Sequence, residues 1–155
     1  MFWNEYLNVQ LSIFSVVRIN LVDPHILSDQ HIVAEYDEIL MLVSYILRYP
    51  SLTNLPVNYC LGKGHMRFFK DKILYLKKRH ELLKKEMRLR GFVTRKSIDL
   101  SLFSKSNLHD WKPSLADVSL VTKRILSRIK DKPKYYRYYG EYKSYMFFKN
   151  LLLKD

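Results

Sequence analysis

The sequence predicts an all-α protein, a compact single domain of three main helices with an extended N-terminal segment and an aromatic C-terminal tail. Three stretches repeat apolar residues at intervals of three and four, which is the spacing of one buried helix face. No stretch alternates apolar and polar residues as a half-buried strand would. The chain has 155 residues and 48% of them are hydrophobic, so one domain with one core is expected.

The first helix is expected over residues 28–48. Ser28 or Asp29 can cap its N-terminus, because their side-chain oxygens accept hydrogen bonds from free backbone N–H groups. Its apolar stripe consists of Ile32, Tyr36, Ile39, Val43 and Ile46. Pro50 and Pro56 bracket the loop that follows.

A second helix is expected over residues 64–90. Its apolar stripe consists of Phe69, Ile73, Leu76, Leu83 and Met87, with His80 on the same line. Gly91 suits the position after the helix, since glycine adopts the left-handed conformation often found there. Arg88 and Arg90 suit the negative end of the helix dipole.

A third helix is expected over residues 114–131. Pro113, Ser114 and Asp117 are typical of a helix start. Its apolar stripe consists of Val118, Val121, Ile125 and Ile129. The stretch 92–113 before it is polar and irregular.

The net charge of +12 is extreme for this length and favours a polyanionic partner, nucleic acid or an anionic membrane, over mere solubility. The charge is clustered, because residues 63–96 hold thirteen Lys and Arg against three Asp and Glu. The basic residues flanking the second apolar stripe are Arg67, Lys70, Lys77, Lys78, Lys84, Lys85 and Arg88. We expect this face to lie near phosphates; a solvated face is the plain alternative.

The tail from Pro133 to Phe148 contains eight aromatic residues interleaved with basic ones. Tyrosines beside cations can stack on bases while the cations hold the backbone. They can also pack on the helical core, which is the preferred interpretation for most of the eight. For the cluster 135–139 both interpretations remain open.

Cys60 is the single cysteine, so an intrachain disulfide and a multi-cysteine metal site are excluded. This fits an intracellular, reducing setting, and Cys60 itself is expected to be a packed side chain. No run approaches the roughly 20 apolar residues of a membrane span. The first fifteen residues contain no Lys or Arg, so a secretory signal is not expected.

Five motifs follow one another in the chain. They are Arg18-Ile19-Asn20-Leu21; Asp-Gln-His-x-x-Ala-Glu-Tyr-x-Glu over residues 29–38; Leu-Gly-Lys-Gly-His-x-x-Phe-Phe-x-Asp-Lys over 61–72; Arg90-Gly91-Phe92; and Tyr-Tyr-x-Tyr-Tyr-Gly over 135–140. Together they resemble the pyrimidine-dimer DNA glycosylase/AP lyase family of the phage endonuclease V type. The resemblance runs from about Val17 to Tyr142.

The resemblance implies a DNA-repair enzyme that cleaves the N-glycosidic bond of pyrimidines in cyclobutane dimers. It then nicks the abasic strand by β-elimination through an imine. The nucleophile implied is the α-amine of Val17, whose ordinary pKa of about 7.7–8.0 leaves a useful neutral fraction, unlike lysine at about 10.4. Glu38 matches the essential glutamate, which stabilises developing positive charge and relays protons.

The resemblance also implies the partner, double-stranded DNA carrying ultraviolet photoproducts or abasic sites, a monomeric protein, and no metal or organic cofactor. The residues matched to DNA contact are Arg18, Gln30, His31, Lys63, Arg124, Arg128, Tyr135, Tyr136, Tyr138 and Tyr139. Arg124 and Arg128 are four apart, so both can point one way. His31 has an equal alternative as a structural histidine, and Lys63 as part of a simple turn.

Two positions depart from the pattern. Asp37 and Met41 stand where the family often has basic residues. We expect weaker phosphate binding and a possible change of lesion preference. Asp37 is also expected to raise the pKa of Glu38, because like charges disfavour joint ionisation.

A nucleophile at Val17 divides the chain into a dispensable extension 1–15, a glycosylase-like domain 16–145 and a tail 146–155. With Met1 as first residue, Val17 has an amide nitrogen and cannot attack. Initiation at Val16, decoded as a methionine that is then removed, is the favoured explanation, and proteolysis is the second. In the third, the extension is retained and the protein uses a lysine such as Lys63 or only binds DNA.

Two further function classes stay open. One is a catalytically inactive DNA-binding protein of the same fold. The other is a basic protein for RNA or anionic membranes, for which the short amphipathic stretch 147–154 is the support.

Overall fold

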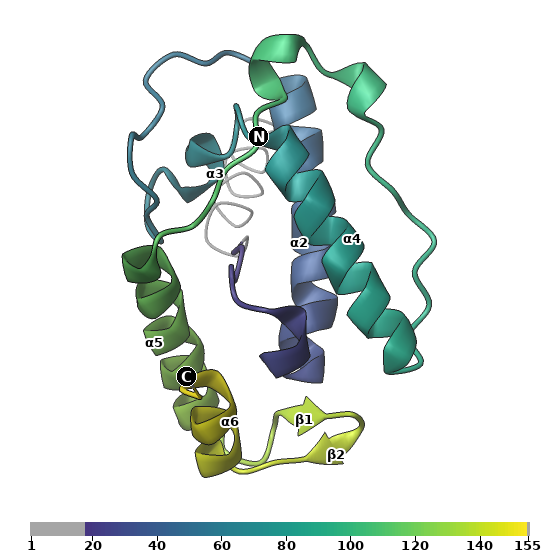
Figure 1. Cartoon of the computed structure of the whole chain (residues 1–155), viewed down its shortest axis with the longest axis vertical. Coiled ribbons are helices and arrows are strands. Elements are labelled where there is room, and N and C mark those ends of the chain that lie inside the picture. The colour runs from purple at the N-terminus through teal and green to yellow at the C-terminus, as the bar shows by residue number, and fades with distance from the viewer. Residues whose placement is uncertain (1–17, 155) are drawn as a thin grey trace, which may run out of the picture.

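The computed structural model describes residues 18–154, which form five α-helices and one small β-hairpin. The helices are α2 (Asp29–Arg48), α3 (His65–Phe68), α4 (Ile73–Leu89), α5 (Leu115–Asp131) and α6 (Tyr145–Leu152), and the strands are β1 (Arg137–Tyr138) and β2 (Glu141–Tyr142). The all-α class and its three main helices are thereby confirmed. Helices α2 and α4 lie side by side, α5 and α6 form a second pair, and the hairpin lies below the N-terminal end of α2 (Figure 1).

The local signals at the helix ends act as the sequence predicts. The hydroxyl of Ser28 accepts a hydrogen bond from the backbone N–H of His31 at 3.1 Å and caps α2. Ser114 and Asp117 form a reciprocal capping box at the start of α5. Gly91 follows α4 with a φ of 85°, a conformation that suits glycine.

The prediction of one continuous second helix is wrong, because the helix breaks at residues 69–72 into α3 and α4. The backbone there pairs with the loop before α5 instead. Lys72 forms an antiparallel bridge with Leu108, and the N–H of His109 donates to the carbonyl of Asp71 at 3.0 Å. Apolar residues on both sides of the break are buried, so their spacing in the sequence still marks one buried face.

Three cations of the predicted basic face serve the fold instead of facing outward. The ammonium of Lys77 donates to the carbonyl of Ile98 at 2.7 Å. Lys84 is only 5% exposed and donates to the hydroxyl of Ser97 at 2.8 Å. Lys70 is likewise buried. Lys77 and Lys84 thus hold the long loop 92–113, and Lys70 donates to the carbonyl of Ser51 in the loop after α2 at 3.1 Å.

The aromatic tail forms a β-hairpin and a short helix, neither of which the sequence predicts. Tyr139 and Gly140 both have positive φ, 50° and 83°, which makes a tight two-residue turn between β1 and β2. Phe148 and Leu152 of α6 are buried in the core that α6 shares with α5. Among residues 18–154, no helix is long and apolar enough to cross a membrane.

Candidate active site

The segment 18–22 is neither helix nor strand and turns at Leu21, which has a φ of 57°, and side chains hold its backbone in the site. The N–H of Ile19 donates to Nε2 of His65 at 3.1 Å, and its carbonyl accepts from the hydroxyl of Tyr59 at 3.1 Å. The other ring nitrogen of His65 donates to the carbonyl of Cys60 at 2.8 Å. Burial lowers the pKa of His65 to about 4, so the ring is neutral and Nε2 can accept.

Glu38 lies against the start of this segment. Its Oε2 accepts a hydrogen bond from the backbone N–H of Arg18 at 3.1 Å. Burial raises the pKa of Glu38 to about 7, an effect that the Arg18 hydrogen bond opposes and the nearby Glu35 reinforces. The pKa of Glu38 is thus raised as expected, but by burial and Glu35 and not by Asp37, whose side chain is exposed.

Three arginines converge on this one carboxyl group. Arg18, Arg124 and Arg128 line the same cavity of about 170 Å³ as Glu38. The remaining lining residues are Asn20, His31, Ala34 and Tyr136. Burial lowers the pKa of Arg124, and the adjacent charges of Arg18 and Arg128 add to the effect. Several guanidinium groups around a single half-ionised carboxyl group make a site for an anion such as phosphate.

The floor of the cavity is built on a fully buried ion pair. Glu35 accepts from Arg79 through both oxygens, at 2.7 and 3.0 Å. The Nδ2 of Asn20 donates to the same carboxylate at 3.0 Å. The charge of Glu35 outweighs the burial that would by itself lower the pKa of Arg79, and raises it. Glu35 therefore serves the framework, and Glu38, one turn further along α2, faces the cavity.

One wall of the cavity is a stacked pair of rings from distant parts of the chain. His31 and Tyr136 are parallel within 6°, with ring centroids 4.9 Å apart. The hydroxyl of Ser28 lies 2.7 Å from Nδ1 of His31. Burial, helped by the charge of Arg124, lowers the pKa of His31 to about 4. His31 is thus a neutral, oriented side chain at neutral pH.

A family sequence model described as pyrimidine dimer DNA glycosylase matches residues 16–100, more than half of the chain. The chain belongs to the pyrimidine dimer DNA glycosylase family. The matched range supplies Arg18, His31 and Glu38 of the cavity. Arg124, Arg128 and Tyr136 come from beyond it, so the α5 and hairpin side of the site lies outside the matched range.

A larger groove of about 740 Å³ adjoins the glycosylase cavity and shares Ala34 with it. Gln30 anchors the hairpin there, donating to the carbonyl of Tyr135 at 2.7 Å and accepting from the N–H of Arg137 at 2.9 Å. The remaining lining residues are Asp29, Val33, Arg90, Phe92, Tyr139, Gly140 and Tyr142. Aromatic and cationic side chains thus border the Glu38 cavity on the hairpin side.

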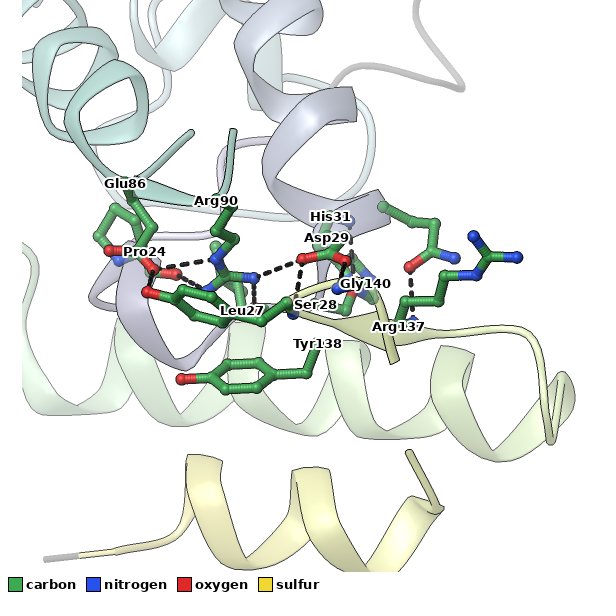
Figure 2. Close-up of polar contacts among 12 residues, drawn as sticks. Pro24, Leu27, Ser28, Asp29, His31, Glu86, Arg90, Arg137, Tyr138 and Gly140 are labelled. Carbon is green, nitrogen blue, oxygen red and sulfur yellow. Dashed lines mark hydrogen bonds and ion pairs between the residues drawn. The ribbon is translucent and has the colours of Figure 1, made fainter. Parts of the chain in front are cut away.

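Arg90 locks the hairpin of this glycosylase to the start of α2 (Figure 2). Its guanidinium donates to Asp29 at 2.9 Å and to Glu86 at 2.9 Å, and lies over the ring of Tyr138 at 4.7 Å. Asp29 in turn accepts from the N–H of Gly140 at 2.8 Å. Packing thus accounts for Tyr138, one of the tyrosines whose role the sequence left open.

The predicted contact residues divide into three groups. Six of them, counting Glu38, line the cavity: Arg18, His31, Glu38, Arg124, Arg128 and Tyr136. Gln30, Tyr135 and Tyr139 line the adjoining groove. The third group lies in neither hollow: Lys63 is exposed before α3, Tyr138 packs against Arg90, and Val17 lies outside the described residues. Sequence reasoning gave no role to Asn20, although it stands in the Arg-Ile-Asn motif.

Proposed function

We propose that the protein excises ultraviolet-damaged pyrimidines from double-stranded DNA with the α-amine of Val17 and then nicks the abasic strand. One observation carries this proposal: the N–H of Arg18 donates to Glu38 at 3.1 Å. Bond lengths keep the nitrogen of any residue within about 4 Å of the nitrogen of the next. A terminal amine on residue 17 would therefore lie within reach of the Glu38 carboxyl group.

The chemistry follows from a neutral amine at that place. Its nitrogen forms a bond to C1′ of the damaged nucleotide while the C1′–N glycosidic bond breaks and the base takes the electron pair. The substituted nitrogen then loses a proton, and the departing base takes one up. The nitrogen lone pair completes a protonated imine as the C1′–O4′ bond opens, and O4′ takes a proton. Removal of a C2′ proton expels the 3′ phosphate and nicks the strand.

Glu38 suits both proton steps. A pKa of about 7 leaves it partly protonated and partly ionised near neutrality, so it can give a proton to O4′ and take one from C2′. Its ionised form also stabilises the positive charge of the imine. Among residues 18–154, no other carboxylate lines the cavity.

The arginines suit the phosphates that flank the damaged nucleotide. Arg18, Arg124 and Arg128 supply planar donors that match phosphate oxygens. Asp37 and Met41 are exposed on the same helix as Glu38. With no cation at those two positions, we expect weaker binding of the lesion strand than a family member with basic residues there would show.

Borohydride trapping tests the proposal. The chain beginning at Val17 with a free amine, the same chain with Glu38→Gln, and the full chain from Met1 are incubated with duplexes that carry an abasic site, a thymine dimer or no lesion. We expect a covalent adduct and a nick only with the Val17 form on the two damaged duplexes. Glu38→Gln should lower the rate by about 100-fold or more.

A matched control is Asp37→Asn, which removes the exposed neighbouring carboxylate and should leave trapping unchanged. Retention of damaged duplex without any adduct from either form would indicate a catalytically inactive DNA-binding protein of this fold. An adduct formed by the full chain with an intact Met1 would exclude Val17 as the nucleophile and would direct the search to a lysine.

A further inference from the structure

Asn20 has one polar atom without a partner. Its side chain is 3% exposed and lines the catalytic cavity. Its Nδ2 donates to Glu35 at 3.0 Å, but no donor among residues 18–154 reaches Oδ1. Buried acceptors are almost always hydrogen-bonded, so an empty one at a cavity wall indicates a donor that arrives with a ligand.

The orientation of this amide is determined by its surroundings. Both oxygens of the Glu35 carboxylate accept hydrogen bonds from Arg79, and a carboxylate has no proton to donate. Turning the amide over would set Oδ1 against a carboxylate oxygen. The bonds from His65 and Tyr59 to residue 19 also fix the backbone beside Asn20. Oδ1 is therefore a preset acceptor that cannot exchange places with Nδ2.

An intact DNA sugar has nothing to offer this acceptor. Its 3′ and 5′ oxygens are esterified, O4′ is an ether, and it lacks the 2′-hydroxyl of RNA. Loss of the base changes this, because a hydroxyl then appears at C1′ when water replaces the base, or at O4′ when the ring opens. An acceptor in the cavity wall would thus discriminate between the sugar before and after the bond is broken.

We propose that Asn20 Oδ1 accepts a hydrogen bond from the sugar hydroxyl that appears when the base is lost. Asn20 is then a substrate-contacting residue that binds the reacted sugar more tightly than the intact one, and it lowers the barrier to the extent that this hydroxyl is already forming in the transition state. This role rests on the proposed function, since it assumes that a damaged nucleotide enters the cavity.

Two unreactive lesions test the proposal on the full chain. One duplex carries a tetrahydrofuran site, which has no hydroxyl at C1′, and the other carries a borohydride-reduced abasic site, which is open and has hydroxyls at C1′ and C4′. Neither can form an imine, so binding is read without catalysis. We expect the wild-type protein to bind the reduced site about two- to tenfold more tightly.

The variant Asn20→Leu keeps the volume of the side chain and removes the acceptor, and we expect the ratio of the two dissociation constants to approach one. Asn20→Ala should do the same and serves if the leucine variant folds poorly. A merely structural role would weaken both complexes equally and leave the ratio unchanged, which overturns the proposal. A preference for a ribonucleotide that depends on Asn20 would also overturn it. If the proposed function itself is wrong, the borohydride-trapping experiment shows this independently, because no covalent adduct forms.

Discussion

Glu35 and Glu38 stand one helical turn apart on α2 but meet opposite electrostatic environments. Glu35 is fully buried and neutralised by Arg79 at 2.7 Å. Glu38 lies near the charges of Arg124 and Arg18 and accepts a hydrogen bond from the backbone N–H of Arg18 at 3.1 Å. The first residue is therefore part of the framework. The second has a pKa raised to about 7 by burial, which costs stability and matches what the proposed proton transfer requires.

Glu38→Gln should make the protein more stable at pH 8. The pKa of Glu38 is raised from 4.5 to about 7 by burial, so the folded state binds more protons than the unfolded state between those values. Stability is thus lost as the pH rises from 4.5 to 7. Because the group is partly open to solvent, we expect a gain of about 1–2 kcal/mol in urea unfolding at pH 8 and almost none at pH 4. An equal gain at both pH values would contradict the assignment.

His65→Leu should destabilise the protein by about 2–4 kcal/mol at pH 7.5, because the N–H of Ile19 and the carbonyl of Cys60 lose their partners. The pKa of His65 is lowered from 6.5 to about 4, so its contribution is present above pH 6.5 and fades as the pH falls toward 4. Urea unfolding of both proteins at pH 7.5 and 4.5 should show the difference shrinking. His109→Leu, at an exposed site, is the matched control and should change little.

Arg90→Met should cost about 3–5 kcal/mol, since it leaves Asp29 and Glu86 without their buried cation. Thermal unfolding checks the loss, and the exposed Arg88→Met, which removes a single bond to Thr94, should stay within about 0.5 kcal/mol. Similar losses for the two variants would contradict a locking role for Arg90.

Arg128→Ala should reduce the salt dependence of DNA binding, because each phosphate contact contributes about 0.9 to the slope of log affinity against log salt concentration. Lys84→Met should leave that slope unchanged and lower the unfolding temperature instead, since Lys84 is buried and bonded to Ser97. Fluorescence anisotropy over a range of salt concentrations checks both. An equal change of slope in the two variants would show that Lys84 also contacts DNA and would contradict its purely structural role.

The helices could be located from the sequence because their signals are local. Ser28, Ser114 and Gly91 act on backbone groups within a few residues of themselves, and apolar spacing reports one buried face wherever the helix lies. The ordered motifs likewise sufficed to predict the family and most residues of the cavity, because side chains that act together keep their order along the chain even when the fold is unknown.

Only the tertiary structure decided which distant groups these side chains and backbone segments contact. The break between α3 and α4 depends on Leu108, the compensation of the Glu35 charge depends on Arg79, and the burial of Lys84 depends on Ser97. Each partner lies at least 13 residues away in the chain. Whether a charged group is desolvated, paired or left free depends on which distant groups the folded chain brings to it, and no local pattern carries that information.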